Sequence, residues 1–325
     1  MCTSKSRSFA CVIGIASALT FSAEPSFGQS WPQRPVRMIV PIAPGSSPDV
    51  AARLFSEHLS SRWSRPIVIE NRPGADGLTG TAAFAATPDD HVLLFSFAAP
   101  LTVYPLIQEK LPYDAVRDVV PISAATETFG TISVPASLPV ATLSDLVALA
   151  RSRPAQLNWT TGGGAFPILF AGFVKSVGLD MVQVSYRDQN LAIQDIAAER
   201  IQVIATPMTA VLPLVNAGKI RVLAVTNKKR SPLWPDIPTV TESGHPDLTF
   251  DGLIGVFGPR GIPDSRRERI SSDVRAVAGN TTVAQRLAGT GQMVGGSTPA
   301  EFSAAIAEQR ANIEAMLRLT GKPTQ

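Results

Sequence analysis

The fold is decided by residues 36–49, VRMIVPIAPGSSPD. The apolar run from Val36 to Ile42 is typical of a buried strand. The helix that follows can be capped by Ser46 or Ser47, and Asp49 complements the positive end of its dipole. A buried strand, a turn of small residues and a capped helix together form the first half of a βαβ unit.

Outward from this stretch, short apolar runs alternate with amphipathic ones, which predicts βαβ units and mostly parallel sheets. The predicted strands are Val36–Ile42, Ile67–Glu70, Val92–Ser96, Leu157–Thr160, Val182–Tyr186, Val203–Thr206, Arg221–Thr226 and Leu253–Gly258. The predicted helices are one that begins near Ser47 and those over Leu143–Ser152, Leu191–Glu199, Ile270–Ala278 and Pro299 to about Leu319.

The chain has 325 residues, of which 45% are hydrophobic and 17% are charged. A globular chain of this length buries a large core, and two domains are more common than one. The formal net charge is +3 and the longest basic run is Lys228 to Arg230. Neither feature is typical of a nucleic-acid-binding protein.

Residues Met1 to Gly28 have the layout of a secretory signal peptide. Lys5 and Arg7 precede an uncharged apolar run from Phe9 to Phe21, and small residues precede a cut before Gln29. The run is shorter than the ~20 residues of a membrane span, and no later segment is a better candidate. We therefore expect export to the periplasm as a soluble protein, with an uncleaved anchor as the alternative.

The sequence offers little for catalysis or metal binding. Cys2 and Cys11 both lie in the predicted signal peptide, so the exported chain would have neither a thiol nor a disulfide. The histidines His58, His91 and His245 do not have the spacing of a metal site. Signatures of hydrolases, nucleotide-binding loops and dinucleotide-binding turns do not occur. We expect no metal, no cofactor and no catalytic residues.

Three strand-to-helix turns are rich in small and hydroxyl residues: Pro44 to Asp49, Thr160 to Gly164, and Pro207 to Thr209 after Thr206. Such turns place free backbone N–H groups beside a helix N-terminus, where an anion is stabilised. In an open α/β sheet they lie at the carboxyl ends of strands, where ligands bind. Any one of them could be an ordinary turn, but three together favour a binding site.

Several strings identify a resemblance to the Bug-type receptors of tripartite tricarboxylate transporters. The opening from Trp31 to Asp49 is similar to theirs, as are VIENRPGA at 68–75 and KLPYD at 110–114. GKIRVLAVT at 218–226 and DIPTV at 236–240 extend the resemblance over nearly the whole exported chain.

The resemblance implies a two-lobed periplasmic binding protein type II fold that closes on a small di- or tricarboxylate or a related organic acid, without a cofactor. Lobe 1 would consist of residues 29–131 and 253–325, and lobe 2 of residues 132–252. The receptor would be a monomer and not an enzyme, and it would pass its ligand to membrane permease subunits.

The resemblance also implies which residues hold the ligand. The first turn and the facing glycine-rich turn would bind one carboxylate through backbone amides and water, and residues after the other strands would line the same cleft. The expected ligand-binding residues are Gly45, Ser46, Ser47, Asp49, Ser96, Ala98, Thr161, Gly162, Gly163, Gly164, Phe166, Tyr186 and Thr206.

The chain departs from the family pattern in the expected cleft. Ser46 and Ser47 replace glycines, while Phe97 and Phe166 stand where small hydroxyl residues are usual. An acidic residue that the family often has near Thr206 is missing. These changes favour a ligand with an apolar or aromatic body, although both phenylalanines could simply pack under the turns.

Two other functions fit the sequence. A sensory receptor that presents its liganded form to a signalling protein needs the same closing cleft. A secreted enzyme on this scaffold would use Asp49, Asp188 or Tyr186 as acid or base, but no base is paired with a nucleophile at a suggestive spacing.

Overall fold

The computed structural model describes residues 1–2 and 31–321. The predicted signal peptide, apart from its first two residues, and the predicted cut before Gln29 lie outside these ranges. None of the described helices is both long and apolar enough to cross a bilayer.

The described chain alternates strands and helices, as the hydrophobic pattern predicts. The strands are β1 (Val36–Val40), β2 (Ile67–Asn71), β3 (Val92–Phe97), β4 (Val119–Pro135), β5 (Asn158–Thr161), β6 (Val182–Gln183), β7 (Val203–Pro207), β8 (Ile220–Val225), β9 (Asp251–Pro259) and β10 (Gln292–Val294). The α-helices are α1 (Ser47–Trp63), α2 (Leu78–Ala85), α3 (Ala99–Thr102), α4 (Tyr104–Ile107), α5 (Leu143–Ser152), α6 (Phe166–Ser176), α7 (Gln189–Ala197), α8 (Met208–Asn216), α9 (Asp264–Ala278), α10 (Thr281–Ala288) and α11 (Pro299–Thr320). Two 3₁₀ turns, η1 (Ala75–Gly77) and η2 (Pro246–Leu248), complete them.

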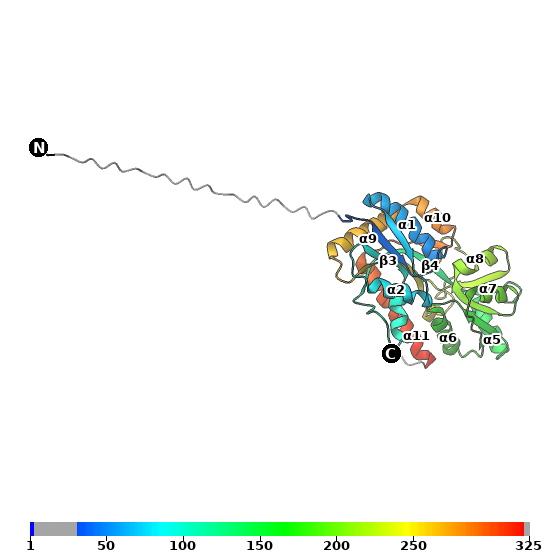
Figure 1. Cartoon of the computed structure of the whole chain (residues 1–325). Helices are drawn as coiled ribbons and strands as arrows, with labels where there is room; N and C mark the ends of the chain where they lie inside the picture. The colour runs from blue at the N-terminus through cyan, green and yellow to red at the C-terminus, as the bar shows by residue number, and fades with distance from the viewer. Residues whose placement is uncertain (3–30, 322–325) are drawn as a thin grey trace.

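The first lobe is built on β2, β1, β3, β9 and the first part of β4, in that order. β1 runs parallel to β2 and β3, whereas β9 runs antiparallel to β3 and to β4. β1, β3 and β9 are largely buried because helices pack on both faces of this sheet (Figure 1). Buried parallel strands read as apolar runs, which is why β1 and β3 were predictable from the sequence.

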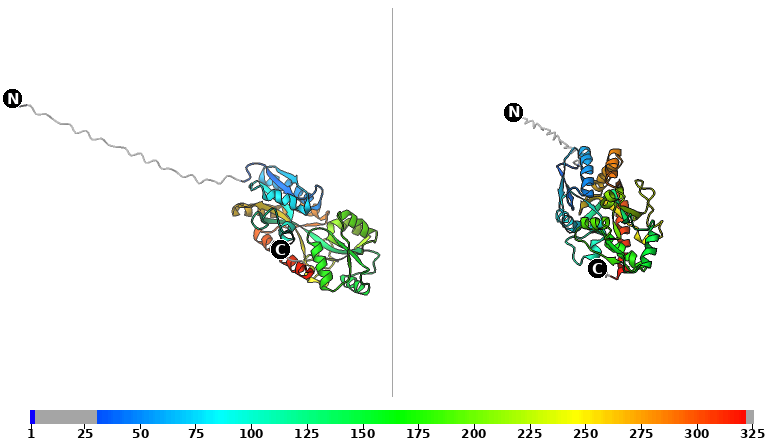
Figure 2. Two further views of the ribbon diagram at one scale, coloured as in Figure 1. Left: turned by 60° about the horizontal axis from the view of Figure 1, so that its bottom comes forward. Right: turned by 90° about the vertical axis from the view of Figure 1, so that its right-hand side faces the viewer.

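β4 passes from one lobe to the other, and the sequence analysis did not predict it. Its first part pairs with β9 from Val119 to Phe129, and its second part pairs with β7 and β8 from Gly130 onward. The second lobe therefore shares this strand and adds β7, β5 and β6 on one side and β8 on the other. Figure 2 shows the resulting two bodies, with the segment around α5 to α8 set apart from the rest.

The return path to the first lobe lies against β4. Thr226 N–H donates to Gly130 O over 2.9 Å, and Asn227 Nδ2 donates to Thr128 O over 3.1 Å. A Cβ on Gly130 would lie 2.3 Å from Thr226 Oγ1, so only glycine allows the two segments to pass this closely. The lobes are joined at this crossing.

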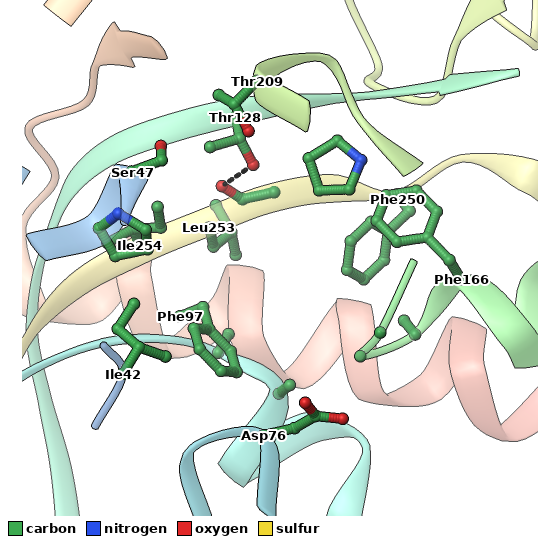
Figure 3. A pocket seen from close by; sticks show the side chains of 18 of the residues that line it. Ile42, Ser47, Asp76, Phe97, Thr128, Phe166, Thr209, Phe250, Leu253 and Ile254 are labelled. Carbon is green, nitrogen blue, oxygen red and sulfur yellow. Dashed lines mark hydrogen bonds between the residues drawn. The ribbon is translucent and has the colours of Figure 1, made fainter. Parts of the chain in front are cut away.

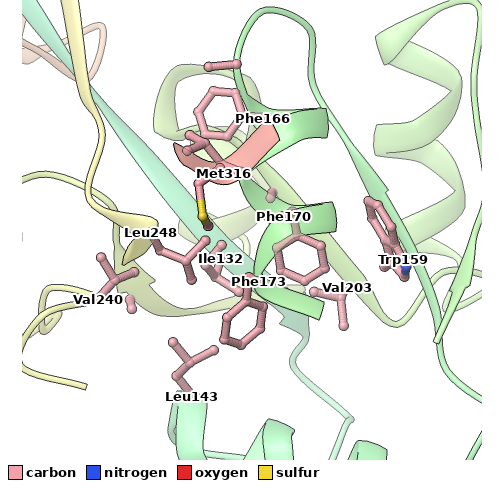
Figure 4. Packing of buried hydrophobic residues seen from close by; sticks show 14 of the residues in the cluster. Ile132, Leu143, Trp159, Phe166, Phe170, Phe173, Val203, Val240, Leu248 and Met316 are labelled. Carbon is pink, nitrogen blue, oxygen red and sulfur yellow. The ribbon is translucent and has the colours of Figure 1, made fainter. Parts of the chain in front are cut away.

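α11 packs against both lobes. Phe302 and Ile306, near its start, belong to a buried cluster of the first lobe, whereas Met316 belongs to the main core of the second. Gly172 of α6 lets Met316 approach, since a Cβ there would lie 3.2 Å from its sulfur (Figure 4). The lobe boundaries expected from sequence remain a prediction, and α11 contacts both sides of the proposed division.

The starts of two predicted helices agree with the structure where a capping box is present. α5 has the predicted bounds, and α11 begins at Pro299 as predicted. Both start with a capping box, in which Thr142 and Asp145 or Thr298 and Glu301 satisfy each other's backbone N–H groups.

Candidate functional site

A cavity of about 250 Å³ lies between the lobes, beside the paired strands β4 and β9. Its walls come from the β1–α1 turn, η1 and the end of β3 in the first lobe, and from the β5–α6 turn and the starts of α7 and α8 in the second (Figure 3). The lining residues are Ile42, Ser47, Pro48, Asp76, Phe97, Ala98, Ala99, Thr128, Gly163, Gly164, Ala165, Phe166, Gln189, Pro207, Thr209, Phe250, Gly252, Leu253, Ile254 and Gln309.

In the β1–α1 turn, most polar groups form hydrogen bonds within the turn or with the residues that flank it. The carboxylate of Asp49 is 1% exposed and accepts hydrogen bonds from Gly45 N, Arg53 Nε and Asn71 Nδ2 at 2.7–2.9 Å. Burial alone would raise the pKa of Asp49, but these hydrogen bonds outweigh it and hold the pKa below its ordinary value. Asp49 and Gly45 therefore do not line the cavity, and their role is to hold the turn in shape.

The two serines of this turn have different surroundings. Ser46 stands at the N-cap of α1, but its hydroxyl donates to Ala43 O over 2.7 Å and makes no capping bond. Ser47 lines the cavity, and its Oγ is buried without a hydrogen-bond partner in the described chain. Of the two serines, Ser47 is thus the one that can donate to a ligand.

The β5–α6 turn leaves its backbone open. Gly163 and Gly164 line the cavity, and their N–H groups donate to no acceptor in the described part of the chain. Gly164 has φ of +70°, a conformation that favours glycine, and α6 begins just after it without a side-chain cap. Free amides at a helix N-terminus are a ready anion site.

Five of the expected ligand-binding residues line the cavity, namely Ser47, Ala98, Gly163, Gly164 and Phe166. The others do not, because their polar groups are used elsewhere. Ser96 is fully buried and bonds to Phe97 O, Gly162 N–H donates to Ala205 O, and the Tyr186 hydroxyl donates to Asp195. Gly45, Ser46, Asp49, Thr161 and Thr206 also lie outside the lining.

Thr206 still influences the cavity through a neighbour. Its Oγ1 accepts a hydrogen bond from Gln189 Nε2 over 2.7 Å, and Gln189 lines the cavity at the start of α7. Asp188, one of the residues considered for acid or base chemistry, caps this helix by accepting from Asn190 N. Asp49, Asp188 and Tyr186 thus each have structural partners, and none of them lines the cavity.

Three aromatic rings line the cavity. Phe166 and Phe250 meet edge to face with ring centroids 5.7 Å apart, and Phe97 lines the cavity from the first lobe, apart from this pair (Figure 3). Phe166 also belongs to the core of the second lobe. Phe166 thus packs under its turn and also faces the cavity, so contact with a ligand remains a prediction.

Several lining residues had no signal in the sequence. Thr128 lies on β4 and Gly252 on β9, and Gln309 comes from α11, far away in the chain. Gln309 is 7% exposed and donates from Nε2 to Asp251 O over 2.7 Å, which leaves Oε1 as a buried acceptor without a partner. Asp76 supplies an acidic group that the sequence analysis had not placed in the cleft.

Away from the cleft, the described residues include one cluster with the side chains of a metal site, Asp89, Asp90 and His91. Two guanidinium groups already neutralise it, since Arg34 pairs with Asp89 and Arg266 pairs with Asp90. The imidazole pairs with Asp90 through Nδ1 and accepts from a backbone N–H through Nε2. The cluster is therefore a network that ties the start of β1 to α9.

The fold and the cleft define a two-lobed solute-binding protein of the periplasmic type. A model of the tripartite tricarboxylate transporter family receptor matches residues 51–321, and the chain belongs to this family. Its members are solute-binding receptors and not enzymes.

Individual relatives support this assignment. BugT of Bordetella pertussis is 28% identical over 314 residues, which cover 95% of this chain and 96% of that one. A solved R. palustris protein with adipate is 28% identical with a TM-score of 0.79, covering 90% and 99% of the two chains. A solved periplasmic transporter protein is 27% identical with a TM-score of 0.77, covering 89% and 98%.

Proposed function

We propose that this receptor captures an organic carboxylate with an apolar body in the periplasm and delivers it to the permease subunits of a tripartite transporter. The ligand contacts would be Ser47 and Ala98 from the first lobe and Gly163, Gly164 and Phe166 from the second. Export by the N-terminal signal segment is part of this proposal.

The observation that carries the proposal is the pairing of free amides with an apolar wall. Gly163 and Gly164 offer N–H groups beside the N-terminus of α6, where a carboxylate is stabilised by hydrogen bonds and by the helix dipole. Most of the remaining surface is apolar, and Phe97, Phe166 and Phe250 are part of it. Such a site binds a charged head and buries an apolar tail.

The adipate-bound relative supports the carboxylate head. Its ligand is an aliphatic acid with a carboxylate at each end, and the structural match covers 90% of this chain. The family description supports delivery to a tripartite transporter.

A thermal-shift screen of the exported chain against organic acids would test the proposal. A ligand that binds the folded state alone stabilises it by about 2.7 kcal/mol at 100 times its Kd. We expect monocarboxylates with apolar or aromatic bodies to raise the melting temperature, while matched alcohols and amides leave it unchanged. A panel in which no carboxylate shifts the melting temperature would contradict the proposal.

Closure of the cleft is the second part of the test. Because both lobes contribute walls to the cavity, a ligand that contacts both should favour the closed arrangement. We expect small-angle scattering to give a smaller radius of gyration with a saturating acid than without it. An unchanged radius would indicate a site that is already closed.

A further inference from the structure

Asp76 is a charged residue inside a cavity that otherwise lacks charge. Among the residues that the structure describes, no lysine, arginine or histidine lines the cavity, and Asp76 is the only carboxylate that does. Its own carboxylate has no hydrogen-bond or ion-pair partner in the described chain, although the residue is exposed to the cleft. A ligand therefore meets one fixed negative charge and no positive side chain.

The backbone holds Asp76 in place. Ala75 and Asp76 have φ of 46° and 49°, a left-handed conformation that costs free energy for residues other than glycine. The hydroxyl of the buried residue Tyr104 donates to the carbonyl oxygen of Asp76 over 2.6 Å. The loop is thus fixed in a conformation that directs this side chain across the cleft.

Across the cleft, Asp76 faces the proposed carboxylate site. A Cβ on Gly163 would lie 3.3 Å from Asp76 Oδ2, so the carboxylate lies directly over the glycine turn (Figure 3). A ligand carboxylate on the amides of Gly163 and Gly164 must therefore lie a few ångströms from Asp76. Two like charges at this separation repel each other, and closure of the cleft strengthens the repulsion by removing water.

We infer that Asp76 is a specificity-determining residue that selects an acid with an ammonium group beside its carboxylate and rejects a second carboxylate. This inference rests on the proposed function, because it assumes that the ligand carboxylate occupies the β5–α6 turn. The ammonium lies between the two carboxylates and neutralises their repulsion. The apolar body packs against Phe97, Phe166 and Phe250.

Three matched acids isolate the role of Asp76. L-Phenylalanine, 3-phenylpropanoate and benzylmalonate share the benzyl body and one carboxylate, and they differ only in carrying an ammonium, a hydrogen or a second carboxylate at the same carbon. L-Leucine, 4-methylpentanoate and isobutylmalonate form the aliphatic counterpart. Calorimetry on the wild type should give a Kd for the amino acid at least about ten-fold lower than for the monocarboxylate that lacks the ammonium group. The malonate should bind most weakly.

Asp76→Asn removes the charge with little change in shape, and asparagine tolerates the left-handed conformation at this position. We expect this variant to lose the preference for the amino acid and to bind the malonate about ten-fold or more tightly than the wild type does. Asp188→Asn, which changes an aspartate outside the cavity, should keep the wild-type order of affinities. Thermal melts of both variants establish that they are folded.

The outcomes separate this inference from the proposed function. If no acid in the broad screen binds, the proposed function is wrong and the inference falls with it. If acids bind but the wild type accepts the malonate as well as the amino acid, or rejects all six probes, only the inference is overturned. It is also overturned if Asp76→Asn lowers the melting temperature and leaves the order of affinities unchanged.

Discussion

The two turns that face the cleft look alike in sequence but differ in how they use their polar groups. The β1–α1 turn satisfies itself, because the buried carboxylate of Asp49 accepts from Gly45, Arg53 and Asn71. The β5–α6 turn has no such carboxylate, and the N–H groups of Gly163 and Gly164 remain open. The difference favours the first turn as a rigid support and the second as the carboxylate site that we propose.

The largest expected effect is the loss of stability on replacing the support. Asp49→Ala removes a buried acceptor and leaves its three hydrogen-bond donors without it. We therefore expect the free energy of unfolding to fall by about 2 to 4 kcal/mol relative to the wild type. Chemical denaturation would measure this. Asp188→Ala, which removes a helix cap, should cost only ~1 kcal/mol. Full stability of Asp49→Ala with abolished binding would instead make Asp49 a ligand residue.

Gly163→Ala examines the carboxylate site itself. The added methyl group occupies the space between the turn and Asp76, at 3.3 Å from Oδ2, so the affinity for an acid found in the screen should fall at least about ten-fold. Stability should change little, because the backbone of Gly163 is not in the left-handed region. Gly279→Ala, at an exposed helix end, is the control. Equal affinity in both variants would place the carboxylate elsewhere.

The two serines of the first turn allow a finer comparison. Ser47→Ala removes the unpartnered hydroxyl in the cavity and should weaken binding up to about ten-fold, with stability intact. Ser46→Ala removes an exposed hydroxyl that bonds only to Ala43 O, and affinity should stay the same. Titration calorimetry on both variants decides. Weaker binding in Ser46→Ala than in Ser47→Ala would reverse the assignment.

The smallest expected effect concerns pH. Burial raises the pKa of Glu127 on β4, and the nearby carboxylate of Asp251 raises it further. The folded chain then holds this proton more tightly than the unfolded chain does. The resulting stability is present below the ordinary glutamate pKa and is lost as the pH rises through the raised pKa.

Glu127→Gln should therefore flatten the fall in melting temperature between about pH 4.5 and neutrality. Glu109→Gln, at an exposed position of the first lobe, should keep the wild-type profile. Identical profiles for wild type and Glu127→Gln would show that the carboxylate is solvated in the folded protein.

The fold was largely predictable because the parallel strands are buried on both faces. β1, β3 and β7 read as apolar runs, and α5 and α11 carry capping residues that mark their starts. β4 was missed because its environment changes along its length at Gly130. A strand whose neighbours change in this way has no uniform pattern, and Pro121 and Glu127 within it also disfavour a strand. α6 was missed because it is apolar nearly all around, which hides helical periodicity.

The site was less predictable than the fold because small and hydroxyl residues serve turns and ligands equally well. Nothing in the sequence distinguishes Ser46 from Ser47, and only the direction of each hydroxyl does. Asp76 and Gln309 reach the cavity from segments remote in the chain, so their roles depend on tertiary packing. The apolar character of the cleft was predictable, because Phe97 and Phe166 stand where the family usually has small hydroxyl residues.

The close crossing at Gly130 has a consequence for how this receptor can diversify. A Cβ at Gly130 would lie 2.3 Å from Thr226, which directly follows β8, and 2.8 Å from the ring of Phe166 in the cavity wall. A substitution that moves Phe166 therefore also affects the packing around Gly130, where the two lobes are joined. Asp76 and Gln189 lie outside that crossing. Substitutions at these two positions would change the ligand preference without changing the packing around Gly130.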